Sequence, residues 1–128
     1  MALRLVQVNF KARDDSAVGR FWAEALGWSV SSEEPGVTNV EPVGFAYPDP
    51  VAVCIDVLAV PESKTVKNRV HIDLTTSAAD RDREIERLLG LGARRVDIGQ
   101  TGEESWTVLA DPEGNEFCVV RPKDTLIG

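Results

Sequence analysis

The sequence repeats itself, and this repeat limits the possible folds more than any other feature. The string VQVNF (6–10) returns as VHIDL (70–74), 64 positions later, and each alternates apolar and polar residues. A second pair at the same offset links VCI (53–55) with FCV (117–119). Alternation of this kind is typical of a strand with one buried face. Two copies of one supersecondary unit explain the common offset better than chance does.

Each half continues with a helical pattern. Apolar residues at helical spacing predict a first helix within residues 16–28 and a second within 77–92. Asp14, Asp15 and Ser16 are N-cap candidates for the first helix, and Gly27 is a plausible stop. Glycines at 90 and 92 are expected to end the second helix.

Short strand patterns follow each helix and are separated by turn strings such as EEPG, YPDP and DPEGN. The predicted strands are 28–32, 44–47 and 51–57 in the first half, and 94–98, 106–110 and 116–121 in the second. The fold class is therefore α+β, with two βαβββ modules that form curved mixed sheets around a cavity. We expect a single domain, residues 1–128, built from repeats at about 3–60 and 66–123.

The alternation also assigns side chains to the two faces of each sheet. Residues expected to face the helices are Val6, Val8, Phe10, Val70, Ile72 and Leu74. Residues expected to line the cavity are Gln7, Asn9, Cys54, Asp56, His71, Asp73, Glu116 and Cys118. A concave polar face of this kind is the usual form of a small-molecule site.

Composition excludes several classes of function. The net charge is −7, from 14 basic and 21 acidic residues, so a phosphate backbone would be repelled and no nucleic acid is expected as partner. Solubility is the commoner reason for such acidity, which also fits a neutral or cationic ligand. No apolar stretch is long enough for a signal peptide or a membrane span, which predicts a cytoplasmic protein with no membrane partner. The 2 cysteines are expected to be reduced thiols.

Three strings carry a resemblance to a known superfamily: FWAEALGW (21–28), KNRVHIDL (67–74) and DPEGNEFCVV (111–120). In this order and spacing the chain resembles the vicinal oxygen chelate superfamily, which includes glyoxalases, extradiol dioxygenases, fosfomycin-resistance enzymes and bleomycin-binding proteins. It is most similar to the glyoxalase-like proteins. The resemblance implies the glyoxalase/bleomycin resistance-like fold and a homodimer.

The resemblance also suggests where a metal would bind. Metal-dependent members use His or Gln, Glu, His and Glu, and the matching positions here are Gln7, Cys54 (or Asp56), His71 and Cys118. Glu116, two residues before Cys118, could supply a shifted carboxylate ligand. Two thiols depart from the family pattern and would suit Zn²⁺ better than Mg²⁺, Mn²⁺ or Fe²⁺. A divalent metal is possible as cofactor, but we favour a site without one.

Each candidate also has a structural interpretation. For His71 we favour a neutral, hydrogen-bonded pocket residue, with a metal ligand and a metal-free acid/base as alternatives. The two thiols behave most often as small buried hydrophobic groups. Aromatic residues Phe45, Tyr47 and Trp106 could stack a planar ligand, or could belong to the core.

The leading functional hypothesis is a small-molecule binding protein of the glyoxalase/bleomycin resistance type. It would hold an aromatic or cationic organic ligand without a catalytic metal, as antibiotic resistance proteins of this kind do. The alternative is a metal-dependent lyase, isomerase or thiol transferase that uses Gln7, His71 and Glu116 or Cys118. A third hypothesis is a metal-free enzyme with His71 and Asp73 or Glu116 as acid and base.

Overall fold

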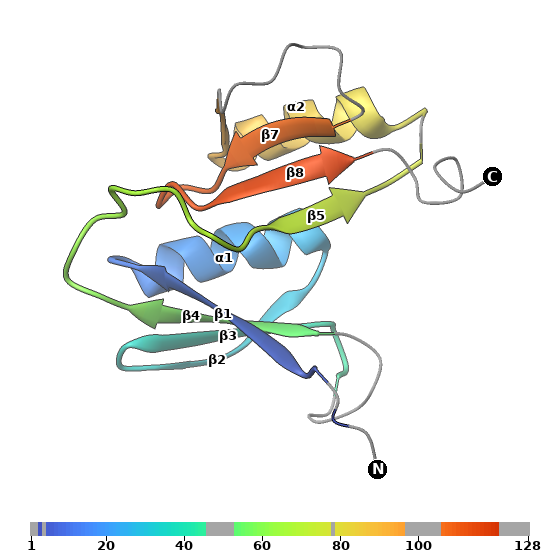
Figure 1. The fold of residues 1–128 in the computed structure, drawn as a ribbon. Helices are drawn as coiled ribbons and strands as arrows, with labels where there is room; N and C mark the ends of the chain where they lie inside the picture. The colour runs from blue at the N-terminus through green and yellow to red at the C-terminus, as the bar shows by residue number, and fades with distance from the viewer. Residues whose placement is uncertain (1–2, 4, 46–52, 78, 97–105, 121–128) are drawn as a thin grey trace. The chain divides into compact units, whose positions relative to one another are not determined.

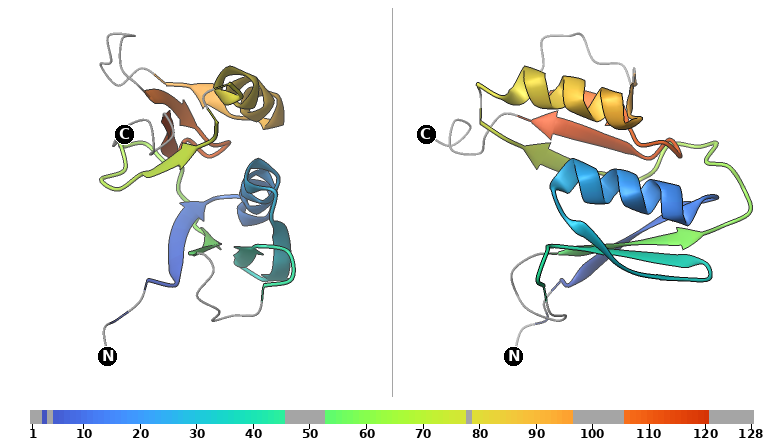
Figure 2. Two further views of the ribbon diagram at one scale, coloured as in Figure 1. Left: turned by 90° about the vertical axis from the view of Figure 1, so that its right-hand side faces the viewer. Right: turned by 180° about the vertical axis from the view of Figure 1, so that it is seen from behind.

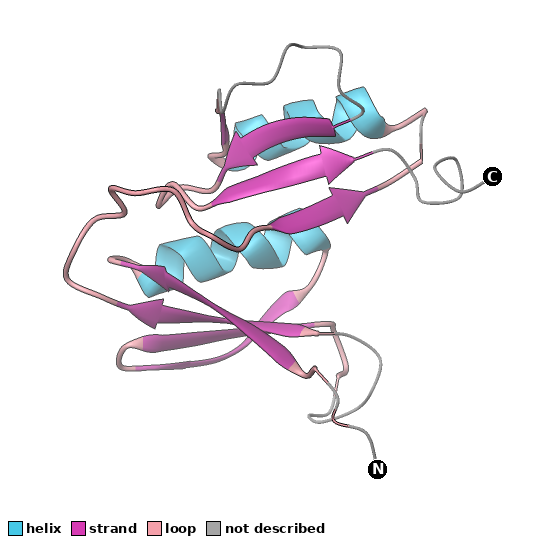
Figure 3. Cartoon of the chain, in the orientation of Figure 1, coloured by secondary structure: helices cyan, strands magenta, loops and turns pink. Residues whose placement is uncertain are grey.

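The computed structural model describes residues 3, 5–45, 53–77, 79–96 and 106–120. The chain divides into two compact units, Met1–Ser63 and Lys64–Gly128. Each unit contains one four-stranded mixed sheet and one helix, as the colours of Figure 3 show. The predicted α+β class with two βαβββ modules is therefore confirmed. Whether the two units form a single domain stays a prediction.

The sheet of the first unit has the strand order β1-β4-β3-β2 (Figure 1). Its strands are β1 (Gln7–Ala12), β2 (Ser29–Glu34), β3 (Val37–Glu41) and β4 (Cys54–Ala59). β1 pairs with β4 in parallel, and the remaining pairs are antiparallel. A parallel pair needs a long crossover connection, and the chain between β1 and β4 provides it with α1 (Asp15–Leu26).

Helix α1 begins and ends where its sequence predicts. The Asp14 side chain caps it by accepting a hydrogen bond from the Ala17 N–H, and Gly27 ends it with a φ of 69°. Its buried face packs on the sheet, where the Trp22 and Phe10 ring centroids lie 5.3 Å apart. Trp22 is fully buried, and the predicted orientation of Phe10 toward the helix is confirmed.

The second unit repeats this arrangement with the order β5-β8-β7-β6. Its elements are β5 (Ile72–Thr75), α2 (Arg81–Leu91), β6 (Arg94–Arg95), β7 (Trp106–Ala110) and β8 (Glu116–Val120). Figure 2 shows α2 lying along one face of this sheet. Arg81 ties the helix to the sheet, because its Nη2 donates to Thr107 Oγ1 at 3.0 Å and to the Val119 carbonyl at 3.1 Å.

Three predictions about the elements are wrong. The strand expected at 44–47 lies earlier, at Val37–Glu41, while Gly44 is in a turn and residues 46 and 47 are outside the described part. Thr38 and Asn39 are adjacent polar residues in β3, so no alternation of apolar and polar residues marks this strand, although its burial alternates along the chain. Val70 is 76% exposed instead of facing a helix, since β5 begins only at Ile72. Gly90 lies inside α2, and Gly92 alone ends it.

The described helices are short and amphipathic. None of them has the length and apolar character needed to cross a bilayer.

Candidate functional site

The sheet of the first unit carries polar side chains on the face opposite α1. Gln7 pairs with Cys54 and Asn9 with Asp56 in the parallel register of β1 and β4, so these four share a face as predicted. Gln7 Nε2 donates to Asn9 Oδ1 at 2.9 Å. β3 adds Asn39, which pairs with Asp56 in register and donates to its carboxylate. This face is a hydrogen-bonded polar layer.

The Cys54 thiol is part of that layer. Its side chain is 1% exposed, and its Sγ donates to Glu41 Oε2 at 3.8 Å. Burial first, then the negative charge and hydrogen bond of Glu41, raise the pKa of the Cys54 thiol. A protonated thiol is neither a strong nucleophile nor a metal ligand. Cys54 therefore acts as a weak hydrogen-bond donor near neutral pH.

The equivalent face of the second unit brings together His71, Asp73 and Cys118. Asp73 and Cys118 are partners in the parallel register of β5 and β8, and His71 lies directly before β5. His71 Nε2 is 3.5 Å from Asp73 Oδ1, with side-chain exposures of 42% and 46%. One ligand atom from each of the three residues lies within 4.8 Å of the others. The sequence predicted that these residues share one face, and the structure places them together.

Cys118 is 5% exposed and its thiol is protonated near neutral pH. Burial, and then the charge and hydrogen bond of Asp73, raise the pKa of the Cys118 thiol, while Lys67 acts in the opposite direction with a smaller effect. The cysteines thus share one chemical state, each beside a carboxylate. Both are free thiols.

Glu116, the first residue of β8, is bound by the segment that opens the second unit. Its carboxylate accepts hydrogen bonds from Lys64 Nζ and from the Asn68 N–H, the latter at 3.2 Å. Lys64 and Glu116 side chains are each 13% exposed. Burial alone would raise the pKa of Glu116, but these hydrogen bonds and the Lys64 charge outweigh it and lower the pKa. Both carboxylate oxygens are therefore engaged within the protein.

The turn between β7 and β8 fixes the position of Glu116. Asp111 is fully buried, and its Oδ1 accepts from the N–H groups of Glu113, Gly114 and Asn115 at 2.9, 3.0 and 2.9 Å. Gly114 has a φ of 106°, which favours glycine. The turn predicted from the string DPEGN is confirmed. Asn68 Nδ2 also donates to Asn115 Oδ1 at 2.9 Å, so the turn anchors the preceding segment as well.

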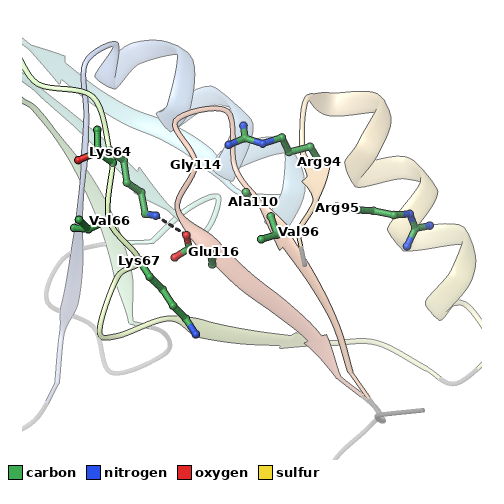
Figure 4. A pocket seen from close by; sticks show the side chains of 10 residues that line it. Lys64, Val66, Lys67, Arg94, Arg95, Val96, Ala110, Gly114 and Glu116 are labelled. Carbon is green, nitrogen blue, oxygen red and sulfur yellow. Dashed lines mark hydrogen bonds and ion pairs between the residues drawn. The ribbon is translucent and has the colours of Figure 1, made fainter. Parts of the chain in front are cut away.

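A pocket of about 610 Å³ lies in the second unit, between the link segment (residues 64–68, before β5) and the face of β6, β7 and β8 opposite α2 (Figure 4). This volume is within the range of small-molecule sites. We call it the link pocket. Its lining residues are Lys64, Thr65, Val66, Lys67, Arg94, Arg95, Val96, Ala110, Gly114 and Glu116.

Glu116 is the one predicted site residue among those that line the link pocket. Phe45 follows β3 and is half-buried, Tyr47 lies outside the described residues, and the side chain of Trp106 is outside them too. The proposed aromatic wall therefore stays a prediction. So does the convergence of the Gln7 and His71 faces on one cavity.

The sequence did not predict four residues that form hydrogen bonds with the candidate site residues: Asn39, Glu41, Lys64 and Asn68. A signal for the first two was present, because VTNVE directly after the EEPG turn contains three β-branched residues, which favour strands. No local signal marks Lys64 and Asn68, since their partner Glu116 is about fifty positions away and the contact depends on the folded link.

Comparison with known proteins gives the family. A family model described as a Glyoxalase-like domain matches residues 7–120. The chain belongs to this glyoxalase-like family. It is thereby a member of the vicinal oxygen chelate superfamily, as the sequence motifs suggested. No curated protein sequence matches the chain significantly.

Solved structures of the same superfamily share the fold. A glyoxalase/bleomycin resistance protein/dioxygenase family enzyme from Burkholderia phytofirmans is 20% identical, with a TM-score of 0.70 and coverage of 93% of this chain and 98% of that one. The fosfomycin resistance protein FosX from Mesorhizobium loti is 17% identical, with a TM-score of 0.70 and coverages of 98% and 99%. The trypanothione-dependent glyoxalase I of Leishmania major is 14% identical, with a TM-score of 0.66 and coverages of 98% and 91%. These similarities show the glyoxalase/bleomycin resistance fold.

The superfamily includes metal-dependent enzymes, and among the described residues one group of side chains could hold a metal ion. An imidazole, a carboxylate and a thiol within 4.8 Å match the three protein ligands of a catalytic Zn²⁺ site in number and kind. The thiol would have to lose its proton, against its raised pKa. Glu116 does not fit, because its oxygens are engaged by Lys64 and Asn68. The fitting set is therefore His71, Asp73 and Cys118.

Proposed function

We propose that this glyoxalase-like chain is a small-molecule binding protein, which holds an organic ligand with polar side chains and without a catalytic metal. The observation that carries this proposal is the link pocket, whose volume of about 610 Å³ suits a small ligand. Its lining combines charged groups with apolar side chains such as Val66 and Val96. Orienting polar groups within a partly apolar lining are usual in such sites.

The protonation and pairing of the candidate metal donors support binding without a metal. Cys54 and Cys118 have raised pKa values and carboxylate neighbours, and the Glu116 carboxylate is held by Lys64. A metal would have to displace protons or break an internal ion pair, and both cost free energy. Hydrogen bonding to an organic ligand requires neither change.

The proposal is tested by calorimetry against a panel of cationic, neutral and anionic organic compounds, aromatic ones included. Binding with a Kd of about 10 µM or tighter, roughly 7 kcal/mol, would support it. The protein is titrated after chelator treatment, so that binding is measured in the absence of divalent ions. A panel in which no compound binds would reject the proposal.

The cluster of His71, Asp73 and Cys118 favours a second candidate, a metal-dependent lyase, isomerase or thiol transferase. A bound divalent ion would polarise a substrate oxygen and stabilise developing negative charge. His71 and Asp73 would hold the ion from the rim of β5, and Cys118 from β8. The side-chain exposures of His71 and Asp73 leave room for a substrate to approach.

Zinc titration of the chelated protein separates the two candidates. One equivalent bound at micromolar affinity in the wild type, and lost in Cys118→Ser, would favour the enzyme. Cys54→Ser is the matched control, since it removes an equally buried thiol from the other sheet. Binding below about a tenth of an equivalent would leave small-molecule binding as the function.

We also propose that the protein acts in the cytoplasm as a homodimer, as its superfamily resemblance suggests. Light scattering measures the mass in solution, and a mass of 14.0 kDa would show a monomer.

A further inference from the structure

The charge lining the link pocket is opposite to that of the chain. Four basic side chains and one carboxylate contribute to its lining: Lys64, Lys67, Arg94, Arg95 and Glu116. The chain as a whole has 14 basic and 21 acidic residues. A concentration of positive charge on an acidic protein is not expected from composition, and the hypothesis of a cationic ligand does not account for it.

The single carboxylate does not neutralise this pocket, because it is already paired. Glu116 forms an ion pair with Lys64, and both side chains are 13% exposed. Arg95 pairs with Glu86 at 3.5 Å and points toward α2 in Figure 4. Lys67 and Arg94 remain, and neither forms a salt bridge with any residue that the structure describes.

Arg94 lines the pocket beside the β7–β8 turn. Its guanidinium lies over the β7–β8 turn, and a Cβ added to Gly114 would be 3.4 Å from Arg94 Nη2 and 3.8 Å from Lys64 Cδ (Figure 4). The absence of a side chain at Gly114 thus lets the arginine lie close to the backbone. A guanidinium binds carboxylate and phosphate groups through two parallel hydrogen bonds, whereas a lysine acts as a point charge.

We propose that the link pocket binds a small organic anion that carries a carboxylate or phosphate group, with Arg94 and Lys67 as its charged contacts. This inference rests on the proposed binding function and narrows it to one class of ligand. Arg94 supplies the directional contact from β6. Lys67 supplies charge from the link segment, on the other side of the pocket lining.

Calorimetric titration with inorganic phosphate and, separately, with citrate tests the inference at an ionic strength fixed with sodium chloride. The two arms distinguish a phosphate ligand from a carboxylate ligand. Arg94→Gln is expected to weaken binding about tenfold or more, because a hydrogen bond to a charged group is lost. Lys67→Gln should also weaken it. The matched control is Arg83→Gln, which removes a 78% exposed arginine from α2 and should leave the affinity unchanged.

Amide chemical shifts of the wild type give a measurement that needs no variant. Phosphate or citrate should shift the Val66 and Gly114 resonances, both from residues of the pocket lining. Equal anion affinity in the wild type and the Arg94→Gln, Lys67→Gln double variant would overturn the inference. Binding of cationic or neutral compounds alone would overturn it too, but would leave the proposed function standing. Binding of no compound of any charge would reject both.

Discussion

Replacing Glu116 with glutamine should loosen the second unit, because the link segment is held to the sheet through this carboxylate. Glutamine keeps the size of the side chain and can still accept the Asn68 N–H, so the change removes mainly the charge that faces Lys64. The Lys64 ammonium would then remain 13% exposed without its counter-ion. Exposed ion pairs contribute at most about 1 kcal/mol, whereas removal of one partner of a buried pair costs about 3–5 kcal/mol.

The Lys64–Glu116 pair is mostly but not fully buried, so we expect the free energy of unfolding to fall by an intermediate amount, about 2 kcal/mol. Native-state hydrogen exchange of the β8 amides measures this loss locally, and the expected change is about 30-fold faster exchange in Glu116→Gln. The matched control is Glu86→Gln, which breaks a pair with exposures of 59% and 72% and should change exchange less than about twofold. Equal effects of the two substitutions would refute the reasoning.

The same substitution predicts a dependence on pH. The pKa of Glu116 is lowered in the folded protein, so its contribution is fully present above the ordinary pKa of 4.5 and is lost as the pH falls through the folded value. The difference in stability between wild type and Glu116→Gln should therefore be constant near neutral pH and shrink in acid. A difference that grows in acid would contradict the assignment.

Three further predictions concern the thiol and the turn. Iodoacetamide should modify Cys118 slowly at neutral pH and faster above its ordinary pKa of 9.0, and Asp73→Asn should accelerate the reaction by removing a charge that raises that pKa. Gly114→Ala should lower the free energy of unfolding in urea by about 1–3 kcal/mol, because alanine is strained at the φ of 106°. The control Gly90→Ala should raise it by roughly 0.5–1 kcal/mol, because Gly90 lies inside α2 and an added Cβ has nothing within 4 Å. Asp111→Ala should cost about 3 kcal/mol because it removes the buried carboxylate that accepts from the Glu113, Gly114 and Asn115 N–H groups, and a small loss in the same assay would refute this.

The sequence predicted the parts of the fold that depend on local patterns. Alternation and helical spacing placed β1, α1, β7 and β8 within a few residues of their observed bounds, and Gly27 ended α1 as expected. β3 was missed because the adjacent residues Thr38 and Asn39 interrupt the alternation of apolar and polar residues in its sequence. A period of two identifies a strand with one polar face, and in β3 that period is visible only in the burial of the folded strand.

The candidate site was predictable in its faces but not in its contacts. Strand periodicity placed Asp73 and Cys118 on one face, since side chains alternate along any strand. Periodicity could not show that Glu116 forms an ion pair with Lys64, because this pair depends on the path of the link segment, which has no regular secondary structure. The basic lining of the link pocket was not predicted for the same reason. Its residues come from the link segment, from β6 and from the β7–β8 turn, which only the folded chain brings together.

The two cysteines occupy equivalent strands of the duplicated module, and in both units burial and a nearby carboxylate raise the pKa of the thiol. They occupy equivalent positions, 64 residues apart, on β4 and β8. Cys54 donates to Glu41 on β3, the strand on one side of β4, whereas Cys118 lies beside Asp73 on β5, the strand parallel to β8. The carboxylate comes from opposite neighbours in the two units, yet each raises the pKa of its thiol. Because different residues raise the pKa of the two thiols in the same direction, both units disfavour nucleophilic attack by their cysteine at neutral pH.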